Sequence, residues 1–397
     1  MSETSFTLTG SANYAAEVIR VFETQPLVGL DNLVGITVNG YQALVPKETK
    51  VGDTLLVFPA ECQISEPFAR EHNLMTDQGG YLANNRRVRA IKLRKQDSNA
   101  LALPLPGDQL PEVGTVFDTI DGVVICQKYE VPSSGGKGSH AAQPRKVRRV
   151  EERMFPEHVD TENYFRNSHK IPDDAHVIVT QKLHGTSWRC TNVEVKRRLT
   201  WKDKLAARFG VTVKDTEWGV LFGSRRVIKD PTDPDQNHYY DTDLWSSYGA
   251  TIADRIPKNI AVYGELIGWV GEQPIQQNYT YRVPKGQVDM YVYRVSVTTA
   301  DGHHYDLPWH GVETFCAERG FKTVPVLWSG PHKDFEVDQW IDTVFWPDYD
   351  NAVRLDKDSP VDEGVVVRYN DEFYKAKGPI FLGHETALLD KGVEISS

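Results

Sequence analysis

The stretch that decides the fold is Gln181-Lys182-Leu183-His184-Gly185-Thr186-Ser187, which follows an apolar run at 177–179. This β-branched run predicts a buried strand at 176–181 with Lys182 at its end. Gly185 allows the backbone after the lysine to approach a ligand closely. A lysine amine must lose its proton before it attacks, which near pH 7 costs about 4 to 5 kcal/mol. Because any strand can end in a lysine before a glycine turn, a structural lysine and a nucleophile both stay open.

Five further short patterns follow Lys182 along the chain. They are Phe222-Gly223-Ser224-Arg225, Val262-Tyr263-Gly264-Glu265-Leu266, Asp289-Met290-Tyr291-Val292-Tyr293, Asp362-Glu363-Gly364-Val365-Val366-Val367-Arg368 and Tyr374-Lys375-Ala376-Lys377-Gly378. Together with the lysine stretch they resemble the nucleotidyltransferase motifs of the covalent lysine ligase and capping-enzyme superfamily. DNA ligases and capping enzymes usually carry Asp at the position of His184, so the sequence is more similar to ATP-dependent RNA ligases. The resemblance covers the chain from about 150 to 380.

Several of these residues have a physical role apart from the resemblance. Glu265 and Glu363 stand at predicted strand ends, where two carboxylates could hold a hydrated Mg²⁺ or Mn²⁺ beside a triphosphate. Lys375 and Lys377 alternate along a strand, so both project from one face and could share a phosphate. Solvated carboxylates and surface lysines are the alternatives for each pair taken by itself.

The base-binding side chains are predicted from the alternation of strands. Tyr291 and Tyr293 share one face of their strand, and Tyr293 is the side chain that we expect to stack on a purine. Val365 or Val367 would cover the opposite face of the base. Packing in the core is the alternative for both tyrosines, and His184 is either a histidine near the phosphate or a core histidine.

The resemblance implies a three-step reaction. Lys182 attacks the α-phosphate of ATP, AMP passes from the lysine to an RNA 5′-phosphate, and a 3′-hydroxyl then displaces AMP. The partner would be RNA with 5′-phosphate and 3′-hydroxyl ends, such as a nicked duplex in RNA repair, and the enzyme would be a monomer. Lys182, Lys375 and Lys377 would be catalytic, with Glu265 and Glu363 holding metal. The implied nucleotide site comprises Lys182, His184, Gly185, Arg225, Glu265, Tyr293, Glu363, Val365, Lys375 and Lys377.

The N-terminal half consists of short β-like runs separated by turn signals. Strands are expected at 15–22, 32–38, 41–45, 54–58, 88–93 and 116–120, with a helix at 66–74. Asn39-Gly40 predicts a tight hairpin turn. Many short strands favour a small barrel similar to an oligonucleotide-binding (OB) fold, in which the basic run 86–95 would lie along one strand.

We therefore predict an α+β protein with two domains. Residues 1–132 form an OB-like β-barrel that binds nucleic acid, 133–149 form a linker, and 150–397 form the nucleotidyltransferase domain, with ATP-grasp-like antiparallel sheets and flanking helices. In that second domain we expect strands at 176–181, 259–265, 287–298 and 364–369 and helices at 199–209, 241–255 and 308–319.

Composition bounds the class of protein. The 397 residues are 40% hydrophobic and 25% charged, with a net charge of -10, and no run approaches the ~18 apolar residues of a membrane span. Four cysteines lie far apart without a zinc or redox spacing. A soluble, cytoplasmic protein without a membrane partner is expected. The net negative charge of the chain disfavours binding to nucleic acid, but basic residues are clustered at 86–95, 145–149 and 196–214.

Other functions stay open at this stage. A DNA ligase or a GTP-using capping enzyme is the nearest alternative, although those enzymes commonly place the barrel after the transferase rather than before it. A noncatalytic OB-fold RNA-binding protein would use the basic clusters alone. A nucleotide-binding regulator would bind ATP without RNA.

Overall fold

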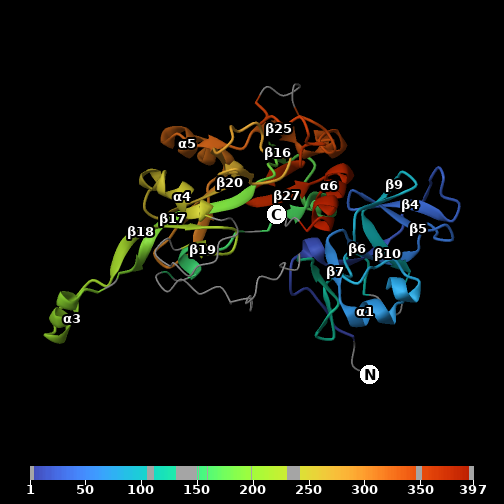
Figure 1. The fold of residues 1–397 in the computed structure, drawn as a ribbon, viewed down its shortest axis with the longest axis horizontal. Coiled ribbons are helices and arrows are strands. Elements are labelled where there is room, and N and C mark those ends of the chain that lie inside the picture. Colours follow the sequence, from blue (N-terminus) through green and yellow to red (C-terminus); the bar gives the residue numbers. More distant parts are fainter. Residues whose placement is uncertain are drawn as a thin grey trace.

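The computed structural model describes residues 4–104, 111–130, 150, 152–158, 160–197, 199–229, 242–345 and 351–392. The predicted linker 133–149 and its basic cluster lie outside the described residues. The fold is α+β and rich in sheets, as predicted (Figure 1). Among the described residues, no helix has both the length and the apolar character needed to cross a membrane.

Two sheets build the C-terminal half. The first has the strand order β15-β27-β26-β16-β25, and the second has the order β19-β18-β17-β20-β22-β23 with β21 and β24 at its margins. The first comprises β15 (Glu162–Asn163), β27 (Glu372–Ala376), β26 (Val365–Tyr369), β16 (His176–Gln181) and β25 (Val326–Pro331). The second comprises β19 (Ile228–Lys229), β18 (Thr216–Gly223), β17 (Thr186–Lys196), β20 (Ile260–Val270), β22 (Val288–Thr298), β23 (His304–Asp306), β21 (Gln273–Pro274) and β24 (Lys322–Thr323).

The predicted central strands of this half are confirmed to within a few residues. Helices α2 (Tyr164–Asn167), α3 (Trp201–Arg208), α4 (Leu244–Ala250) and α5 (Trp309–Arg319) accompany them. The helix expected at 241–255 is shorter than predicted, since α4 ends at Ala250 and a 3-10 turn follows at Ala253–Arg255.

The chain passes from one sheet to the other at Lys182. Strand β16 is buried through Val177 and Val179, and its last residue is Gln181. Strand β17 then begins at Thr186 in the second sheet. A Cβ at Gly185 would lie 2.2 Å from the carbonyl oxygen of Leu266, so this crossing requires glycine. The lysine is thereby held at the junction of the two sheets.

The N-terminal half contains smaller sheets. Their orders are β1-β12-β13, β10-β6-β2-β11, β14-β7, β3-β4-β5 and β8-β9. The strands are β1 (Phe6–Thr7), β2 (Ala16–Arg20), β3 (Gln25–Pro26), β4 (Leu33–Val38), β5 (Tyr41–Pro46), β6 (Thr54–Pro59), β7 (Cys62–Ile64), β8 (Ile91–Leu93), β9 (Gln96–Ser98), β10 (Ala100–Pro104), β11 (Val116–Phe117), β12 (Thr119–Ile120), β13 (Val123–Val124) and β14 (Cys126–Lys128), with helix α1 at Glu66–Glu71. Among the described residues these sheets stay open, and no closed barrel is formed.

The predicted hairpin at Asn39-Gly40 is confirmed. Val38 pairs with Tyr41, and Asn39 and Gly40 have φ angles of 49° and 78°, as a primed turn requires. The strand expected at 88–93 is shorter, because only Ile91–Leu93 pairs, in the hairpin β8-β9. The basic run therefore does not follow one strand, and its member Arg87 is buried.

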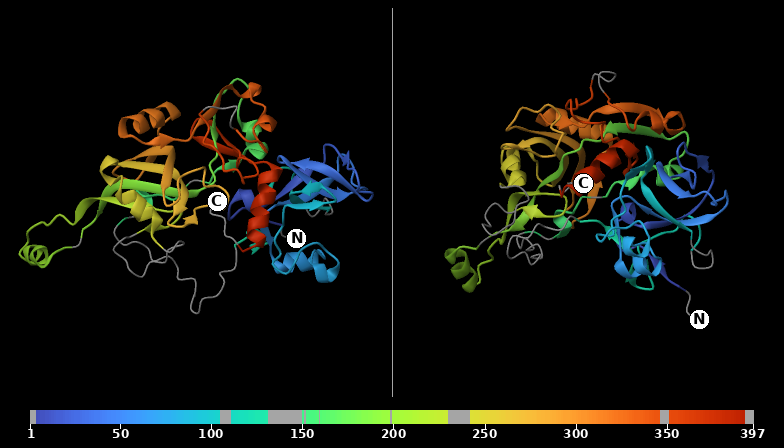
Figure 2. Two further views of the ribbon diagram at one scale, coloured as in Figure 1. Left: turned by 45° about the horizontal axis from the view of Figure 1, so that its top comes forward. Right: turned by 45° about the vertical axis from the view of Figure 1, so that its right-hand side comes forward.

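Helix α6 (Pro379–Asp390) was not predicted and lies between the two halves (Figures 1 and 2). Thr386 is the central contact, since its hydroxyl accepts a hydrogen bond from the amide of Ala90 at 3.1 Å and donates one to Glu61. Arg87 donates to the carbonyl oxygen of Thr386 at 3.2 Å and forms ion pairs with Glu61 and Asp390. The last helix of the catalytic half is thus bonded to the N-terminal half.

Candidate functional site

Lys182 is the centre of a cavity at the junction of the two sheets. Its amide donates to the carbonyl oxygen of Gly364 at 3.0 Å, which fixes the turn against β26. Its Nζ donates to Oε1 of Glu363 at 2.6 Å. Eight of the predicted site residues line this cavity: Lys182, His184, Arg225, Glu265, Tyr293, Glu363, Lys375 and Lys377.

Glu363 joins the nucleophile candidate to a second lysine. The Nζ of Lys377 lies 2.8 Å from the same Oε1 that Lys182 contacts. Burial alone would raise the pKa of Glu363, but the Lys182 and Lys377 ammoniums hold it well below its ordinary value. Two lysines therefore share one buried carboxylate.

Glu385 of α6 is a second carboxylate on Lys377, and the sequence analysis did not identify it. Its oxygens lie 3.1 and 3.3 Å from Nζ. Burial opposes the charge of Lys377, yet Glu363 and Glu385 raise the pKa of this lysine above its ordinary value. Lys377 consequently stays charged throughout the neutral range.

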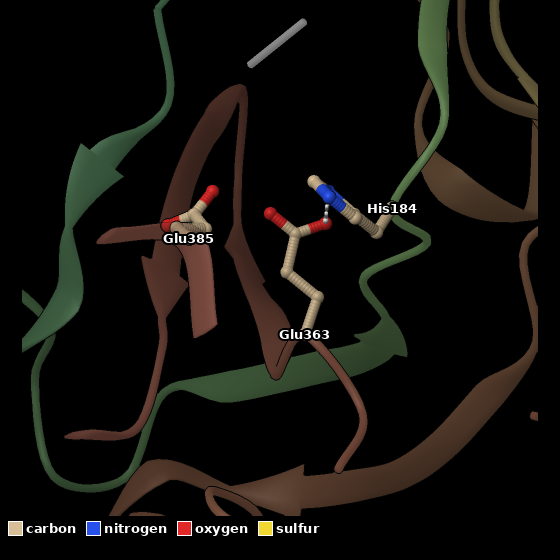
Figure 3. A group of neighbouring side chains, drawn as sticks. All are labelled: His184, Glu363 and Glu385. Atoms are coloured by element: carbon tan, nitrogen blue, oxygen red, sulfur yellow. Dashed lines mark ion pairs between the residues drawn. The ribbon is translucent and has the colours of Figure 1, made fainter. Parts of the chain in front are cut away.

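His184, Glu363 and Glu385 form a buried group whose ligand atoms lie within 4.8 Å of one another. The carboxylate of Glu363 lies between the other two side chains, with Nδ1 of His184 at 3.7 Å (Figure 3). Lys377 contacts both carboxylates of the group, so an ammonium already supplies the positive charge there. The His184 ring also meets the rings of Tyr279 and Phe381 edge-on, which places this histidine in the core as well as near the site.

Glu265 approaches the lysine turn from β20. Its Oε1 accepts a hydrogen bond from the amide of Gly185 at 3.1 Å, and its neighbour across the sheet is Ser187 on β17. Burial raises the pKa of Glu265 to about 8, against the opposing effect of Lys182. A buried carboxylate of this kind can bind a divalent cation in place of its proton.

Lys375 and Arg225 are two further cations of the cavity. Burial, followed by the charges of Lys377 and Lys182, lowers the pKa of Lys375 to about 7. Arg225 forms an ion pair with Asp160, a residue that the sequence analysis missed because it belongs to none of the motifs. Six basic side chains thus line one cavity, which is the arrangement expected around a polyphosphate; they are Lys182, Arg225, Arg294, Arg368, Lys375 and Lys377.

The far end of the cavity suits a flat base. Tyr293 lines it from β22, and its ring centroid lies 5.3 Å from that of His158. Val365 is not part of the lining, because its side chain and that of Val367 are buried in the core. Val366, on the other face of β26, lines the cavity instead. The side chains of β26 therefore alternate in the opposite sense from the prediction, with Val366 facing the cavity and Val365 and Val367 facing the core.

Arg368 is the next-to-last residue of the same strand and was quoted in a motif without a role. Its guanidinium lies over the rings of Trp309 and Phe373, at 4.6 and 4.8 Å from their centroids. Burial lowers its pKa to about 9. Arg368 lies in both the Lys182 cavity and an adjoining one, where it could donate hydrogen bonds to the edge of a base.

A further cavity connects the site to the N-terminal half. Arg225 and Lys375 line both this space and the Lys182 cavity. Tyr14 and Lys128 line it from the N-terminal side, with Nζ of Lys128 5.5 Å from the Tyr14 ring centroid. The two cavities are therefore adjacent, and residues of both halves line the second one.

Comparisons with known proteins agree with this geometry. A model of the RNA ligase family matches residues 175–381, more than half of the chain. The comparison with curated proteins found no match.

Among solved structures, an apo mutant of the RNA ligase of Naegleria gruberi is similar at a TM-score of 0.63 and 19% identity, covering 96% of this chain and 100% of that one. The same enzyme with pyrophosphate gives a TM-score of 0.63 at 17% identity and covers 94% and 98%. A mutant with ATP and manganese gives 0.61 at 16% identity and covers 96% and 99%. At these identities the likeness shows a shared fold over nearly the whole chain.

Proposed function

This chain belongs to the RNA ligase family, and from that premise we propose that it seals RNA with ATP through AMP bound covalently to Lys182. The observation that carries the proposal is the position of the lysine, in a cavity shared with Lys375, Lys377 and Arg225. The structures of the N. gruberi enzyme with ATP and manganese support the choice of nucleotide and metal.

In the first step the neutral amine of Lys182 attacks the α-phosphate of ATP. A P–N bond forms, the P–O bond to pyrophosphate breaks, and the nitrogen, which becomes positively charged on attack, releases one proton to solvent. Lys375 and Lys377 neutralise the phosphate, and positioning with charge neutralisation supplies most of the rate in transfers of this kind. Mg²⁺ or Mn²⁺ held by Glu265 and Glu363 would stabilise the charge that develops on the phosphate when bound.

The next two steps return the lysine and join the RNA. A 5′-phosphate oxygen attacks the AMP phosphorus, the P–N bond breaks, and Lys182 takes up a proton. The 3′-hydroxyl then attacks the activated 5′-phosphorus, loses its proton, and AMP leaves. Arg225 stands between the nucleotide cavity and the space beside Tyr14, so we assign it to the phosphates at the junction.

The domain assignment and substrate remain part of the proposal. Residues 1–132 act as an OB-like nucleic-acid-binding domain, 133–149 as a linker and 150–397 as the transferase, with α6 bonding the two halves. The substrate is a nicked RNA duplex. We also propose a monomer in the cytoplasm, where reducing conditions suit the four free cysteines.

The test is labelling with α-labelled ATP and Mg²⁺ or Mn²⁺. Wild type should form an acid-stable adduct and seal nicked RNA, whereas Lys182→Ala should do neither. Lys333→Ala removes a surface lysine that pairs with Asp174 and should behave as wild type. Labelling of Lys182→Ala would overturn the nucleophile assignment. An adduct formed with GTP alone, or sealing confined to DNA nicks, would overturn the choice of substrate.

A further inference from the structure

A basic arm extends from the second sheet, and the steps proposed above leave it without a role. We define the arm as residues 196–216, at the outer ends of β17 and β18 together with α3 between them. Figures 1 and 2 show it projecting away from the rest of the molecule. Strand β17 begins four residues after Lys182 and runs from Thr186 to Lys196, which at about 3.3 Å per residue is about 33 Å.

The charge of the arm is opposite to that of the whole chain. Residues 196–214 contain seven Lys or Arg and one acid, in a protein of net charge -10. Arg197 pairs with Asp203 at 2.9 Å, and Lys214 pairs with Glu194 at 3.0 Å. Within the described part of the chain the remaining basic side chains of the arm form no ion pair; they are Lys196, Lys202, Lys204 and Arg208.

Helix α3 also exposes its apolar side chains. None of its residues is buried, and Trp201 and Phe209 are 70% and 78% exposed. Local bonds hold the helix in place: Thr200 and Asp203 form a capping box, and Arg197 donates to the carbonyl oxygen of Lys214 at 2.9 Å. A short helix usually gains its stability from packing. This helix is instead held by its caps and exposes aromatic rings, so it is suited to binding a partner outside the chain.

Exposed aromatic rings beside unpaired cations are the combination that binds nucleic acid, through stacking and phosphate contacts. We propose that the arm is an RNA-binding surface that holds the substrate about 30 Å from Lys182, which is about nine base pairs of duplex at about 3.4 Å each. This inference rests on the proposed function for its substrate. It predicts that sealing depends on the length of duplex beside the nick.

The test compares two triple variants. Lys202→Gln/Lys204→Gln/Arg208→Gln removes three charges from the arm, and Lys170→Gln/Lys285→Gln/Lys333→Gln removes three charges from exposed lysines elsewhere. Both should form the Lys182 adduct with ATP at the wild-type rate, which shows that each is folded. Only the arm variant should raise the KM for nicked RNA with long flanking duplexes, by about tenfold or more at 0.15 M salt.

The salt dependence separates phosphate contacts from indirect effects. For the arm variant the slope of log K against log salt should fall by about 2 to 3, since each lost phosphate contact removes about 0.7 to 0.9. On duplexes with flanks under about six base pairs, the arm variant and wild type should have equal KM values.

Equal affinities and slopes for the two triple variants would overturn the inference and would leave the exposed rings of α3 for a protein partner. A different outcome separates the two proposals. If wild type forms no adduct but binds RNA, and the arm variant does not bind RNA, the proposed function is refuted and the arm is still an RNA-binding surface.

Discussion

Replacing Glu363 by glutamine should destabilise the free protein and at the same time make it respond more strongly to phosphate. Lys182 and Lys377 lie 2.6 and 2.8 Å from one oxygen of Glu363, whose side chain is 2% exposed. Without the carboxylate, two ammoniums at most ~5 Å apart repel each other by about 3 kcal/mol at an effective dielectric constant of about 20. Glu385 still pairs with Lys377 and offsets part of this cost. We expect Glu363→Gln to lower the free energy of unfolding by about 3 kcal/mol.

The assay is urea unfolding followed by tryptophan fluorescence, with and without pyrophosphate and without metal. Pyrophosphate returns negative charge to the two lysines, so it should stabilise Glu363→Gln more than wild type, in which Glu363 competes for them. The gain can reach about 2.7 kcal/mol at a hundredfold excess over Kd. Glu272→Gln is the matched control, because Glu272 and its partner Lys285 are 82% and 57% exposed and this ion pair should contribute less than about 1 kcal/mol.

The pH dependence gives a second check on the same variant. The pKa of Glu363 is held below its ordinary value, so its stabilisation is present above the unfolded pKa of about 4.3 and is lost as pH falls through the folded pKa. The stability difference between wild type and Glu363→Gln should therefore be present at pH 6 and should shrink as the pH falls below about 4. A variant within about 1 kcal/mol of wild type, with no larger response to pyrophosphate, would refute the charge sharing described here.

Three other changes test separate parts of the site. Lys375 has a pKa of about 7, so its charge is present at pH 6 and largely lost at pH 8.5. Pyrophosphate binding by wild type, measured by calorimetry, should therefore weaken over this pH range relative to binding by Lys375→Met. Equal pH profiles for the two proteins would contradict the assignment. Val366→Ala should weaken ATP binding up to about tenfold with little loss of stability, because Val366 lines the cavity. Val365→Ala should lower the free energy of unfolding by about 2 kcal/mol and leave the ATP affinity unchanged, because Val365 lies in the core. The reverse pattern would show that Val365 contacts the base. Arg87→Met leaves Glu61 buried without its counterion and should lower the free energy of unfolding by about 3 to 5 kcal/mol at pH 8. The loss should be smaller at pH 5, because burial raises the pKa of Glu61 to about 7 and the carboxyl is protonated at pH 5. A loss that does not depend on pH in urea unfolding would contradict this expectation.

The strands that carry the site were predictable because their sequences are strongly patterned. The run before Lys182 is β-branched and continuous, and it forms a strand buried in the middle of a sheet. The Asn39-Gly40 turn was predictable because few residue pairs accept two positive φ angles. The phase of β26 was not predictable, since three consecutive valines carry no alternation that would distinguish a core face from a cavity face.

Contacts between distant segments explain what the sequence could not reveal. Arg87 looked like one member of a solvated basic run, but it is buried against Glu61 and α6. Glu385 and Asp160 became site residues only because the fold brings them to Lys377 and Arg225. The helix that carries Glu385 did have a local signal, since Gly378-Pro379 places a proline in its first turn, where a proline is favourable.

Three cations of the site are paired with carboxylates of the protein itself. Glu363 and Glu385 contact Lys182 and Lys377, and Asp160 contacts Arg225. Phosphate must therefore displace protein carboxylates from these cations. Its binding free energy is smaller than unpaired cations would give, but the cations are already oriented. Because Glu385 belongs to α6, which is bonded to the N-terminal half, a shift of that half on RNA would change the partner of Lys377. The same ion pairs thus connect the N-terminal half to the lysines of the candidate site.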